Sequence, residues 1–438
     1  MIFLSLALVL IALVLTVIAI STLYWMTHAW WTPQHNNATS YPLIRRTQNT
    51  PGFERRDLDL PKMSFSLIMP CREEEELVME ATLLALLGQT HPHVEIIISV
   101  GHDDEPTVEI AHRLASLYDQ VRVSVNYSPV GTKNKPRQMN DALLMCRNEV
   151  VGIFDAESIA APDPLVNIDA VFQRRNADVV QGAVQLVNYR DTWYSLRNCL
   201  EYYFWFRSRL HAHAQRGFIP LGGNTVFIKT ALLREVGGWD GNCLAEDCDL
   251  GVRLSTLGHK ITVAYSPHLV TREETPGSIR QMITQRTRWS LGFMQVLAKG
   301  DWKALPTRAD RFRAWWCLMQ QHCMVFAGFA VPLSIITALF IRPPLLVVML
   351  TWIPAIPTLL MVVFECAALR AFGRDHGFPI RTYDYLRLVV STPFYQLFLA
   401  IASIRALVKF RQSDFRWEKT SHIGAHLELV KAPMEESA

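Results

Sequence analysis

The chain has 438 residues, which is enough for two or three domains, and half of these residues are hydrophobic. The mean hydropathy of +0.13 is high for a wholly soluble protein, so membrane segments are expected. The net charge of +3 says little about partners, because the basic residues gather beside apolar stretches. We expect no nucleic-acid partner. The eight cysteines form no CxxC pair, which argues against a zinc site and predicts free thiols.

The N-terminal stretch is almost entirely apolar. No charged residue occurs from Ile2 to Thr27, and the stretch ends in "YWMTHAWW", whose aromatics fit a membrane–water interface. A cleaved signal peptide is the alternative, but a basic start and a small-residue cleavage site are both missing. We therefore expect residues 1–30 to form a retained membrane anchor. The basic run "IRRTQNTPGFERR" predicts that residues 31–60 are a cytoplasmic linker and that the N-terminus lies outside.

Residues 61–300 have the pattern of a soluble α/β domain. "FSLIM" is a buried strand that Pro70 stops, and the next helix carries four glutamates, 73–76, in its first turn. "HVEIIISV" is a second strand, and Asp103 and Asp104 follow it, at the sheet edge where open α/β sheets bind ligands. The helix "KPRQMNDALLMC" then leads to the strand "EVVGIF". Strands that alternate with helices predict a parallel sheet with right-handed crossovers.

Two carboxylates end that last strand. Asp155 and Glu157 in "FDAES" stand one residue apart, and alternate side chains of an extended segment point the same way. Both can therefore reach a single cation. Oxygen ligands of this kind suit Mg²⁺ or Mn²⁺, ions that proteins commonly share with the phosphates of a substrate.

A second acidic group opens a helix further along the chain. In "LAEDCDLGVRL", Glu246, Asp247 and Asp249 crowd into four residues. Helix capping explains one or two of them, but three carboxylates so close together raise one another's pKa. A carboxylate of this kind can serve as a general base. Upstream, Gly222 and Gly223 in "PLGGNTVF" mark a place where the backbone comes close to another group.

Seven motifs in order resemble those of the membrane-embedded family 2 glycosyltransferases, the group of cellulose, chitin and hyaluronan synthases and their smaller bacterial relatives. The motifs are "MPCREEE", "GHDDEPT", "NKPRQMNDAL", "FDAES", "PLGGNTVF", "GGWD…LAEDCDLGVRL" and "QRTRW", and they run from about Phe65 to Trp289. The resemblance implies an α/β fold, namely a nucleotide-sugar-binding domain of the GT-A type with a Rossmann-like mixed sheet, flanked by transmembrane helices. It also implies an inverting sugar transfer.

The resemblance assigns roles to residues around the donor. Asp155 and Glu157 match the metal-and-diphosphate motif, with Glu in place of the commoner second Asp, so direct metal ligation is expected first of Asp155. The family's "DDGS" element reads "SVGHDD" here, and Asp103 or Asp104 takes the place of its first aspartate, displaced by about three residues. Further contacts to the nucleotide sugar are expected from Pro70, Arg72, Glu74, Lys135 and Arg288.

The resemblance also assigns the chemistry and the acceptor side. Asp247 matches the base that deprotonates the acceptor hydroxyl, and Arg288 offsets the charge of the leaving diphosphate. Trp289 offers a flat apolar face to the acceptor sugar. Arg286 lies outside the QxxRW signature and is expected to be solvated or to face lipid; an amphipathic helix at a membrane surface is the alternative interpretation of the whole stretch. Acceptor contacts are expected from Gly222, Gly223, Glu246, Gln285 and Trp289.

The C-terminal third is expected to contain an interfacial amphipathic segment, 301–323, a membrane region, 324–410, and a cytoplasmic tail, 411–438. Its third apolar stretch, 386–408, is interrupted by Pro393 and has basic residues on both flanks. One crossing cannot leave both flanks in the cytoplasm, so this stretch is expected to lie in the interface or to re-enter. "FRWEKTSHIG" resembles a cytoplasmic Trp-x-Lys-Thr element of relatives, which supports that topology.

The sequence thus predicts a multi-pass cell-membrane enzyme with a cytoplasmic catalytic domain. It would transfer a sugar from a nucleotide sugar, expected to be a UDP-sugar, to a growing polysaccharide. A single transfer to a lipid acceptor is the alternative, and a catalytically inactive scaffold or transporter is a remote one. The expected partners are the nucleotide sugar, a glycan or lipid acceptor, and membrane lipids, with Mg²⁺ or Mn²⁺ as cofactor.

Overall fold

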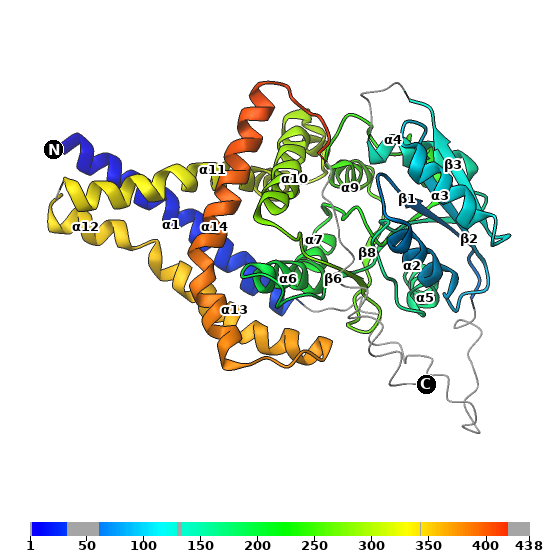
Figure 1. Cartoon of the computed structure of the whole chain (residues 1–438). Helices are drawn as coiled ribbons and strands as arrows, with labels where there is room; N and C mark the ends of the chain where they lie inside the picture. Colours follow the sequence, from blue (N-terminus) through cyan, green and yellow to red (C-terminus); the bar gives the residue numbers. More distant parts are fainter. Residues whose placement is uncertain (1, 33–60, 129–133, 342, 419–438) are drawn as a thin grey trace.

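A computed structural model of the chain describes residues 2–32, 61–128, 134–341 and 343–418. At its centre lies a seven-stranded sheet with the strand order β3-β2-β1-β4-β7-β5-β8 (Figure 1). All neighbouring strands run parallel except β7, which is antiparallel to both β4 and β5. The α/β mixed sheet that we predicted is confirmed, although the reversed strand was not foreseen. The strands are β1 (Phe65–Pro70), β2 (Val94–Gly101), β3 (Val121–Asn126), β4 (Val150–Ile153), β5 (Val179–Gln181), β7 (Val226–Lys229) and β8 (Ile261–Val263).

The hydrophobic core fills both faces of this sheet. Alternate residues of β1 take part in two different clusters: Phe65, Leu67 and Met69 pack into one, and Ile68 packs with Ile97 into the other. This is the period of two that a strand imposes on its side chains. The helices around the sheet are α2 (Glu76–Leu87), α3 (Glu105–Ala115), α4 (Lys135–Met145), α5 (Pro164–Arg175), α8 (Thr230–Glu235) and α9 (Glu246–Thr256).

Helix α2 begins later than the sequence predicted. It starts at Glu76, with Glu75 as its N-cap, so only one of the four glutamates lies in its first turn. Glu73 instead has a positive φ of 51° in the turn that leaves β1. The prediction that all four glutamates lie in the first turn of the helix is therefore wrong, because Glu73, Glu74 and Glu75 precede its first residue.

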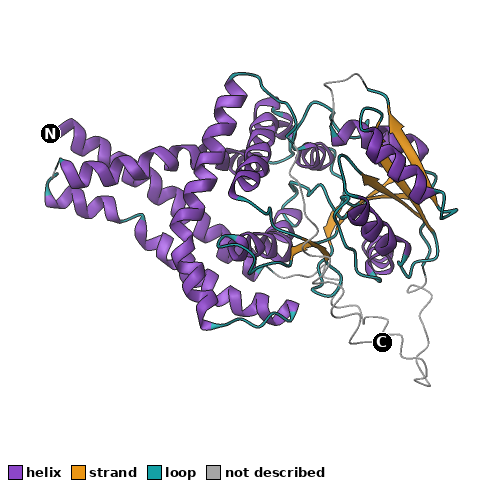
Figure 2. Cartoon of the chain, viewed as in Figure 1, coloured by secondary structure: helices purple, strands orange, loops and turns teal. Residues whose placement is uncertain are grey.

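A second, smaller layer connects the sheet to the apolar helices, as Figure 2 shows by secondary structure. It contains a two-stranded parallel sheet of β6 (Val184–Leu186) and β9 (Thr271–Glu273). Its helices are α6 (Ser195–Phe204), the π-helical turn Trp205–Arg209, α7 (Leu210–Ala214), α10 (Ile279–Lys299) and the 3₁₀ turn Asp301–Ala304.

Four helical segments of the described chain are long and apolar enough to cross a membrane. Three of them reach away from the sheet in Figure 1. The segments are α1 (Ile2–Trp31), α11 (Arg308–Phe340), α12 (Leu345–Trp352) together with α13 (Ala355–His376), and α14 (Thr382–Arg411). One continuous helix, α11, covers both sides of the boundary predicted at residue 323.

Helix α14 differs from the other three segments. It runs crosswise to them in Figure 1 and packs against α10 and α11. Leu388, Tyr395 and Ala402 are fully buried on one face, while Val390 and Phe394 are more than half exposed on the other. The predicted interruption at Pro393 is wrong: the helix is continuous through this residue, because its packing extends on both sides of the proline.

Candidate active site

A lysine lies at the centre of the carboxyl edge of the sheet. Lys135 is the first residue of α4, whose N-cap Asn134 accepts a hydrogen bond from the backbone N–H of Arg137 at 3.1 Å. The Lys135 ammonium pairs with Asp155, at the end of β4, and donates to the carbonyl oxygen of Gly223 at 3.0 Å. Three motifs that are far apart in the sequence, "NKPRQ", "FDAES" and "PLGGN", therefore meet at one ammonium group.

The charges around Lys135 shift one another's protonation. Burial alone would lower the pKa of Lys135, but Asp155 and Glu246 outweigh it and hold the pKa above the ordinary lysine value. Burial, assisted by Glu157, raises the pKa of Asp155, although Lys135 opposes the change. The Lys135 ammonium is therefore a cation surrounded by carboxylates. This arrangement suits an anionic ligand that binds together with counter-ions of its own.

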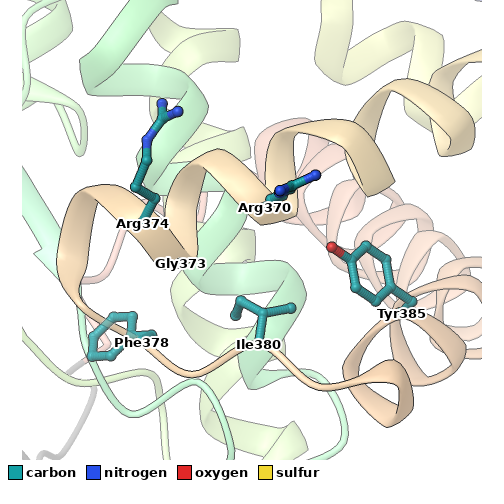
Figure 3. A pocket seen from close by; sticks show the side chains of 6 residues that line it. All are labelled: Arg370, Gly373, Arg374, Phe378, Ile380 and Tyr385. Carbon is teal, nitrogen blue, oxygen red and sulfur yellow. The ribbon is translucent and has the colours of Figure 1, made fainter.

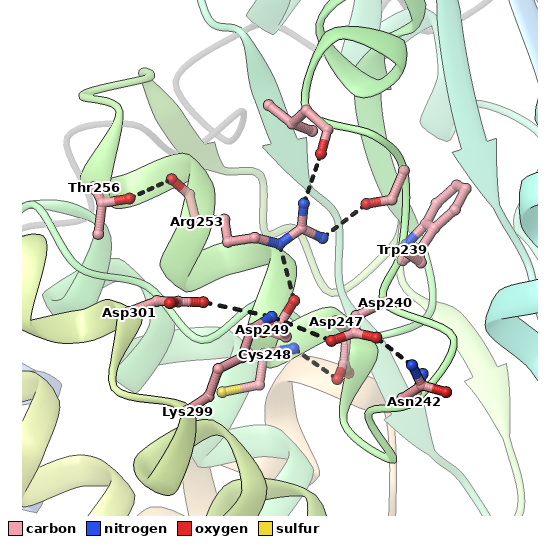
Figure 4. Close-up of polar contacts among 12 residues, drawn as sticks. Trp239, Asp240, Asn242, Asp247, Cys248, Asp249, Arg253, Thr256, Lys299 and Asp301 are labelled. Carbon is pink, nitrogen blue, oxygen red and sulfur yellow. Dashed lines mark hydrogen bonds and ion pairs between the residues drawn. The ribbon is translucent and has the colours of Figure 1, made fainter.

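The acidic start of α9 divides into two parts. Figure 4 shows Asp249 between Arg253, at 2.9 Å, and Lys299, at 2.7 Å, so its charge is neutralised inside the protein. Asp247 instead accepts from the backbone N–H of Cys248 at 2.7 Å and makes none of these ion pairs. Asp249 is thus a structural residue, which leaves Glu246 and Asp247 as the chemically available carboxylates.

Burial is the main influence on both of these carboxyl groups. It raises the pKa of Asp247, and together with the neighbouring Asp247 it raises the pKa of Glu246 to about 7. Lys135 and Arg288 oppose both shifts. The sequence predicted mutual repulsion among three carboxylates as the cause, but Asp249 has its own cations, so removal from water is the larger effect.

The paired glycines leave room beside Asp247. A side chain at Gly223 would place its Cβ 3.1 Å from Oδ2 of Asp247 and 3.6 Å from Nζ of Lys135. The N–H of Gly222 donates to the buried side chain of Gln181 at 2.8 Å. The close approach that the sequence predicted here is confirmed, and it keeps the space in front of Asp247 open.

Helix α10 brings the QxxRW residues to the same place. Arg288 is close enough to Asp155, Glu246 and Asp247 to oppose the rise that burial causes in the pKa of all three. The Trp289 ring lies 6.2 Å from that of Tyr202, centroid to centroid. Gln285 is buried, yet its Oε1 has no hydrogen-bond partner within the described part of the chain. This acceptor is therefore available to a ligand or to water.

Arg286 is not where the sequence placed it. We expected a solvated or lipid-facing cation, but its guanidinium pairs with Glu201 and Asn198 of α6 and lies 3.2 Å from the hydroxyl of Tyr395 of α14. Its Cζ also lies 4.6 Å from the centre of the Trp289 ring. The prediction is wrong because these partners come from distant segments of the chain. They hold the Arg286 guanidinium against the Trp289 ring, so Arg286 positions that ring.

The donor-side residues lie at the ends of β1 and β2. Pro70 is the last residue of β1, and Glu74 lies in the turn that follows it. The Arg72 guanidinium makes a two-bond pair with Asp103, at 2.9 and 3.3 Å, while Asp104 accepts from the backbone N–H of Glu73. The two candidate first aspartates thus have different uses, since Asp103 orients Arg72 and Asp104 holds the turn.

Sequence reasoning missed one carboxylate near Asp155. Glu273, the last residue of β9, is buried and accepts hydrogen bonds from Asn224 and, at 2.8 Å, from Ser158. Burial and the charges of Glu157 and Asp155 raise its pKa to about 8. Its only signal in the sequence was its place in "TREET", just ahead of α10.

The acidic residues fit a shared cation better than a closed metal site. Within the described residues, no three His, Cys, Asp or Glu side chains converge as a ready-made cage. Asp155 and Glu157 supply hard oxygen donors, which suits a divalent ion that takes its remaining ligands from a diphosphate.

Comparison with known proteins identifies the family of this chain. The profile described as glycosyltransferase like family 2 matches residues 61–292. A β-monoglucosyldiacylglycerol synthase of Trichormus variabilis is 26% identical over 368 residues, which cover 82% of this chain and 76% of that protein. A poly-β-1,6-N-acetyl-D-glucosamine synthase of Staphylococcus epidermidis is 24% identical over 256 residues, covering 56% of this chain and 58% of that protein.

The fold has a solved counterpart. A mannosyltransferase of Pyrobaculum calidifontis, solved with GDP-mannose and Mn²⁺, aligns with a TM-score of 0.58 at 16% identity. The alignment covers 93% of this chain and 99% of that one, so the likeness extends into the helices beyond the sheet. With more than half of its length matched by the family profile, the chain belongs to the family 2 glycosyltransferases and is an inverting enzyme with a GT-A fold.

Proposed function

We propose that this enzyme transfers a sugar from a nucleotide sugar, with Asp247 as the general base. The observation that supports this role is the meeting of Lys135, Asp155, Asp247 and Arg288 at one edge of the sheet. Asp247 is partly exposed, and the missing side chain of Gly223 leaves room beside its carboxylate, while Asp249 is neutralised by two cations. Asp247 is therefore the acidic residue of α9 that is placed to accept a proton.

In the proposed reaction the acceptor hydroxyl attacks the anomeric carbon from the side opposite the diphosphate. Its proton passes to a carboxylate oxygen of Asp247 as the new glycosidic bond forms. The bond to the diphosphate breaks at the same centre, which inverts its configuration. Arg288 and Lys135 offset the charge on the leaving diphosphate, a task that suits the fixed fork of a guanidinium.

A divalent cation would be held by Asp155, with Glu157 beside it. When bound, it supplies positive charge that screens the diphosphate. The Mn²⁺ in the solved mannosyltransferase supports use of a divalent ion in this fold. We propose Mn²⁺ or Mg²⁺ here. EDTA should abolish turnover and either ion should restore it, and full activity in the chelator would contradict the assignment.

The proposed donor is a UDP-sugar. Pro70, Arg72 and Glu74 lie at the end of β1, where the family resemblance places the base and ribose. The pairing of Arg72 with Asp103 would present a fixed, oriented guanidinium to that part of the nucleotide. The mannosyltransferase holds GDP-mannose, so competition between UDP-sugars and GDP-sugars for turnover is the direct check.

Two acceptors are candidates. Extension of a polysaccharide is the first and is the reaction named for the staphylococcal relative. A lipid acceptor is the second, and it is favoured by the extent of the match to the glucosyldiacylglycerol synthase, which covers 82% of this chain against 56%. For either acceptor we propose Gln285 and Trp289 as contacts, with Gly222, Gly223 and Glu246 shaping the space between them and Asp247.

The membrane arrangement follows from the helices. We infer that α1, α11 and the α12–α13 pair cross the bilayer and that α14 lies along its cytoplasmic surface, because one face of α14 is packed and the other is apolar and exposed. Three crossings put Ile2 and the end of α14 on opposite sides, with the basic residues at the end of α14 in the cytoplasm beside the catalytic domain. The predicted cytoplasmic linker and tail fall largely on residues 33–60 and 419–438, which lie outside the described part of the chain.

One experiment tests the reaction and separates the acceptors. Purified membranes that contain the full chain are supplied with a panel of nucleotide sugars and Mn²⁺, and the release of nucleotide and the size of the product are measured. Asp247→Asn serves as the blank. A ladder of products indicates polysaccharide synthesis and a single small product indicates lipid glycosylation, whereas no turnover above the blank with any donor would refute the proposal.

A further inference from the structure

A cavity of about 370 Å³ opens at the corner between α13 and α14, far along the chain from the residues of the candidate active site. Figure 3 shows its lining, which combines arginine, tyrosine and apolar side chains from the end of α13, the connecting segment and the first turn of α14. It shares no residue with the candidate active site. The lining residues are Arg370, Gly373, Arg374, Phe378, Ile380 and Tyr385.

A glycine determines the shape of this cavity. A Cβ at Gly373 would lie 2.3 Å from a side-chain carbon of Ile380 and 2.9 Å from the carbonyl oxygen of Phe378. Only glycine therefore allows the returning segment to lie directly on α13. Phe378 is fixed from the other side, because its ring packs 4.9 Å from that of Tyr189 and 5.3 Å from that of Phe372. The cavity is a built feature of the corner.

The charge at the mouth of the cavity is positive. Arg370 and Arg374 lie one turn apart on α13, and both are exposed. Arg370 makes no hydrogen bond or ion pair within the described residues. Arg374 reaches only Asp375, at 3.4 Å, and that carboxylate also accepts from Tyr203 at 2.6 Å and faces Arg207 at 3.5 Å. Two guanidinium groups are thus largely available to an outside ligand.

The cavity lies at the edge of the apolar surface. On α13 the exposed apolar side chains Leu359, Leu360 and Val363 end two turns before Arg370. On α14 the exposed apolar face begins with Tyr383 and Leu386, on the other side of the corner. In the membrane arrangement proposed above, the arginines and the tyrosine that border these two apolar surfaces would lie at the level of the phospholipid headgroups.

We propose that this cavity binds the phosphate-bearing headgroup of an anionic membrane phospholipid. Two guanidinium forks suit the oxygens of a phosphate, and the Tyr385 hydroxyl adds a further donor. The acyl chains would lie on the exposed apolar residues of α13. The headgroup would thereby hold the corner at which the chain turns from the last crossing into α14.

Native mass spectrometry of the full chain in detergent, titrated with a dioleoyl phosphatidylglycerol probe, tests this assignment. The Arg370→Gln/Arg374→Gln variant should lose affinity for the lipid by about fivefold for each arginine, the scale on which one basic side chain contributes at an anionic surface. Arg370→Lys/Arg374→Lys should bind the lipid with an affinity between that of wild type and that of the double glutamine variant, because it keeps the charge but loses the guanidinium fork. Arg308→Gln is the matched control, since Arg308 is also exposed and also lies at the end of a membrane helix.

The outcomes separate the possible ligands. The proposal is supported if Arg308→Gln binds the lipid with wild-type affinity and the double glutamine variant loses affinity. Equal loss in the control would show general surface charge, and unchanged binding in the double variant would show that the lipid binds elsewhere; either result overturns it. Complete displacement of the lipid by millimolar inorganic phosphate would identify a free-phosphate site and would also overturn it. None of these readouts depends on the transferase reaction.

Discussion

The carboxyl edge of the sheet and the helical layer beneath it differ in how their charged residues find partners. At the edge, each contributing motif is short, and Glu246 and Asp247 are adjacent in the sequence. In the layer, Arg197 of α6 pairs with Glu365 of α13 across 168 residues, and Tyr395 donates to Glu201 across 194 residues. Short motifs can be interpreted from the sequence, whereas pairs made by tertiary packing cannot.

In the helical layer, charged side chains are buried and therefore need an oppositely charged partner. Arg197 is almost fully buried and is held by Glu365, with two bonds at 2.6 and 3.2 Å, and by Thr392 at 2.7 Å. A buried charge without a partner is costly, so each partner must come from whichever helix packs there. The difference teaches that each catalytic group stands in a short motif that the sequence displays, whereas the ion pairs that join α6 to α13 and α14 form only through tertiary packing.

The sharpest comparison within the edge itself is Asp247 against Asp249. Asp247→Asn keeps the size of the side chain but removes its ability to accept a proton, so transfer should fall by about two to four orders of magnitude while nucleotide-sugar binding persists. Asp249→Asn should instead lower the melting temperature, because Arg253 and Lys299 lose their counter-ion. Activity and nucleotide binding of both variants are to be measured; equal loss of activity per folded molecule would remove the distinction.

The pair in the helical layer should show its importance in stability. Arg197→Met leaves Glu365 buried without its cation, and breaking a buried pair in this way costs about 3–5 kcal/mol. The double variant Arg197→Met/Glu365→Met removes both charges and should recover most of that loss. Thermal unfolding of the detergent-solubilised chain gives the comparison. If the double variant were as unstable as the sum of the two single variants, the residues would not be coupled.

The same difference between short motifs and tertiary pairs determines which site residues could be predicted from the sequence. Asp155, Asp247 and Arg288 stand in patterned motifs, so their candidate roles could be read before the fold was known. Glu273 could not, because it ends a three-residue strand whose pairing with β6 leaves no pattern in the sequence. Arg286 was assigned to solvent or lipid for the same reason, since its partners Glu201 and Tyr395 lie on other helices.

In the fold, too, features marked by local sequence were predicted and features set by tertiary packing were not. Strands β1, β2 and β4 and the helices beside them were readable because apolar runs and turn residues mark each unit, whereas β3 was not identified from the sequence. The antiparallel direction of β7 was not readable either, since strand direction depends on the long excursion through α6 and α7 that precedes it. The continuity of α14 through Pro393 likewise depends on packing against α10 and α11.

The pH profile tests the edge in a different way. Burial and Asp247 raise the pKa of Glu246 to about 7, and burial raises that of Asp247. Raised values mean that this pair takes up protons at a higher pH than free carboxyl groups do, and a protonated base cannot accept the acceptor's proton. We therefore expect kcat/KM to fall by about tenfold per pH unit as the pH is lowered, and the fall should begin above the ordinary aspartate range because burial raises the pKa of Asp247. A profile that falls only around the ordinary aspartate pKa of about 4 would contradict this shift.

Arg286 links the two regions and should give a smaller, more specific effect. Arg286→Gln removes the cation beside the Trp289 ring, so the KM for the acceptor should rise by about tenfold, on the scale of a cation–π contact and one charged hydrogen bond. Nucleotide binding and slow hydrolysis of the donor to water should persist, because water needs no stacking surface. Tyr395→Phe is the control and should change the KM less, since Arg286 keeps Glu201. Loss of nucleotide binding in Arg286→Gln would instead show that the layer supports the whole edge.

The smallest effect is expected from a test of how the helical layer meets the membrane. Ser413 lies exposed just after α14, and Ser413→Cys introduces a thiol there without disturbing a described contact of the site. If α14 lies along the cytoplasmic surface, an impermeant thiol reagent should not label this cysteine in intact cells but should label it after permeabilisation. Ile2→Cys, at the end of α1 that the proposed arrangement places outside the cell, should be labelled without permeabilisation. Activity should be unchanged in both variants.

Labelling of Ser413→Cys from outside would mean that α14 crosses the bilayer, and its exposed apolar face would then be a lipid-facing side of a fourth span. The pairs from Arg197 to Glu365 and from Arg286 to Tyr395 would in that case lie within the membrane and not at its surface.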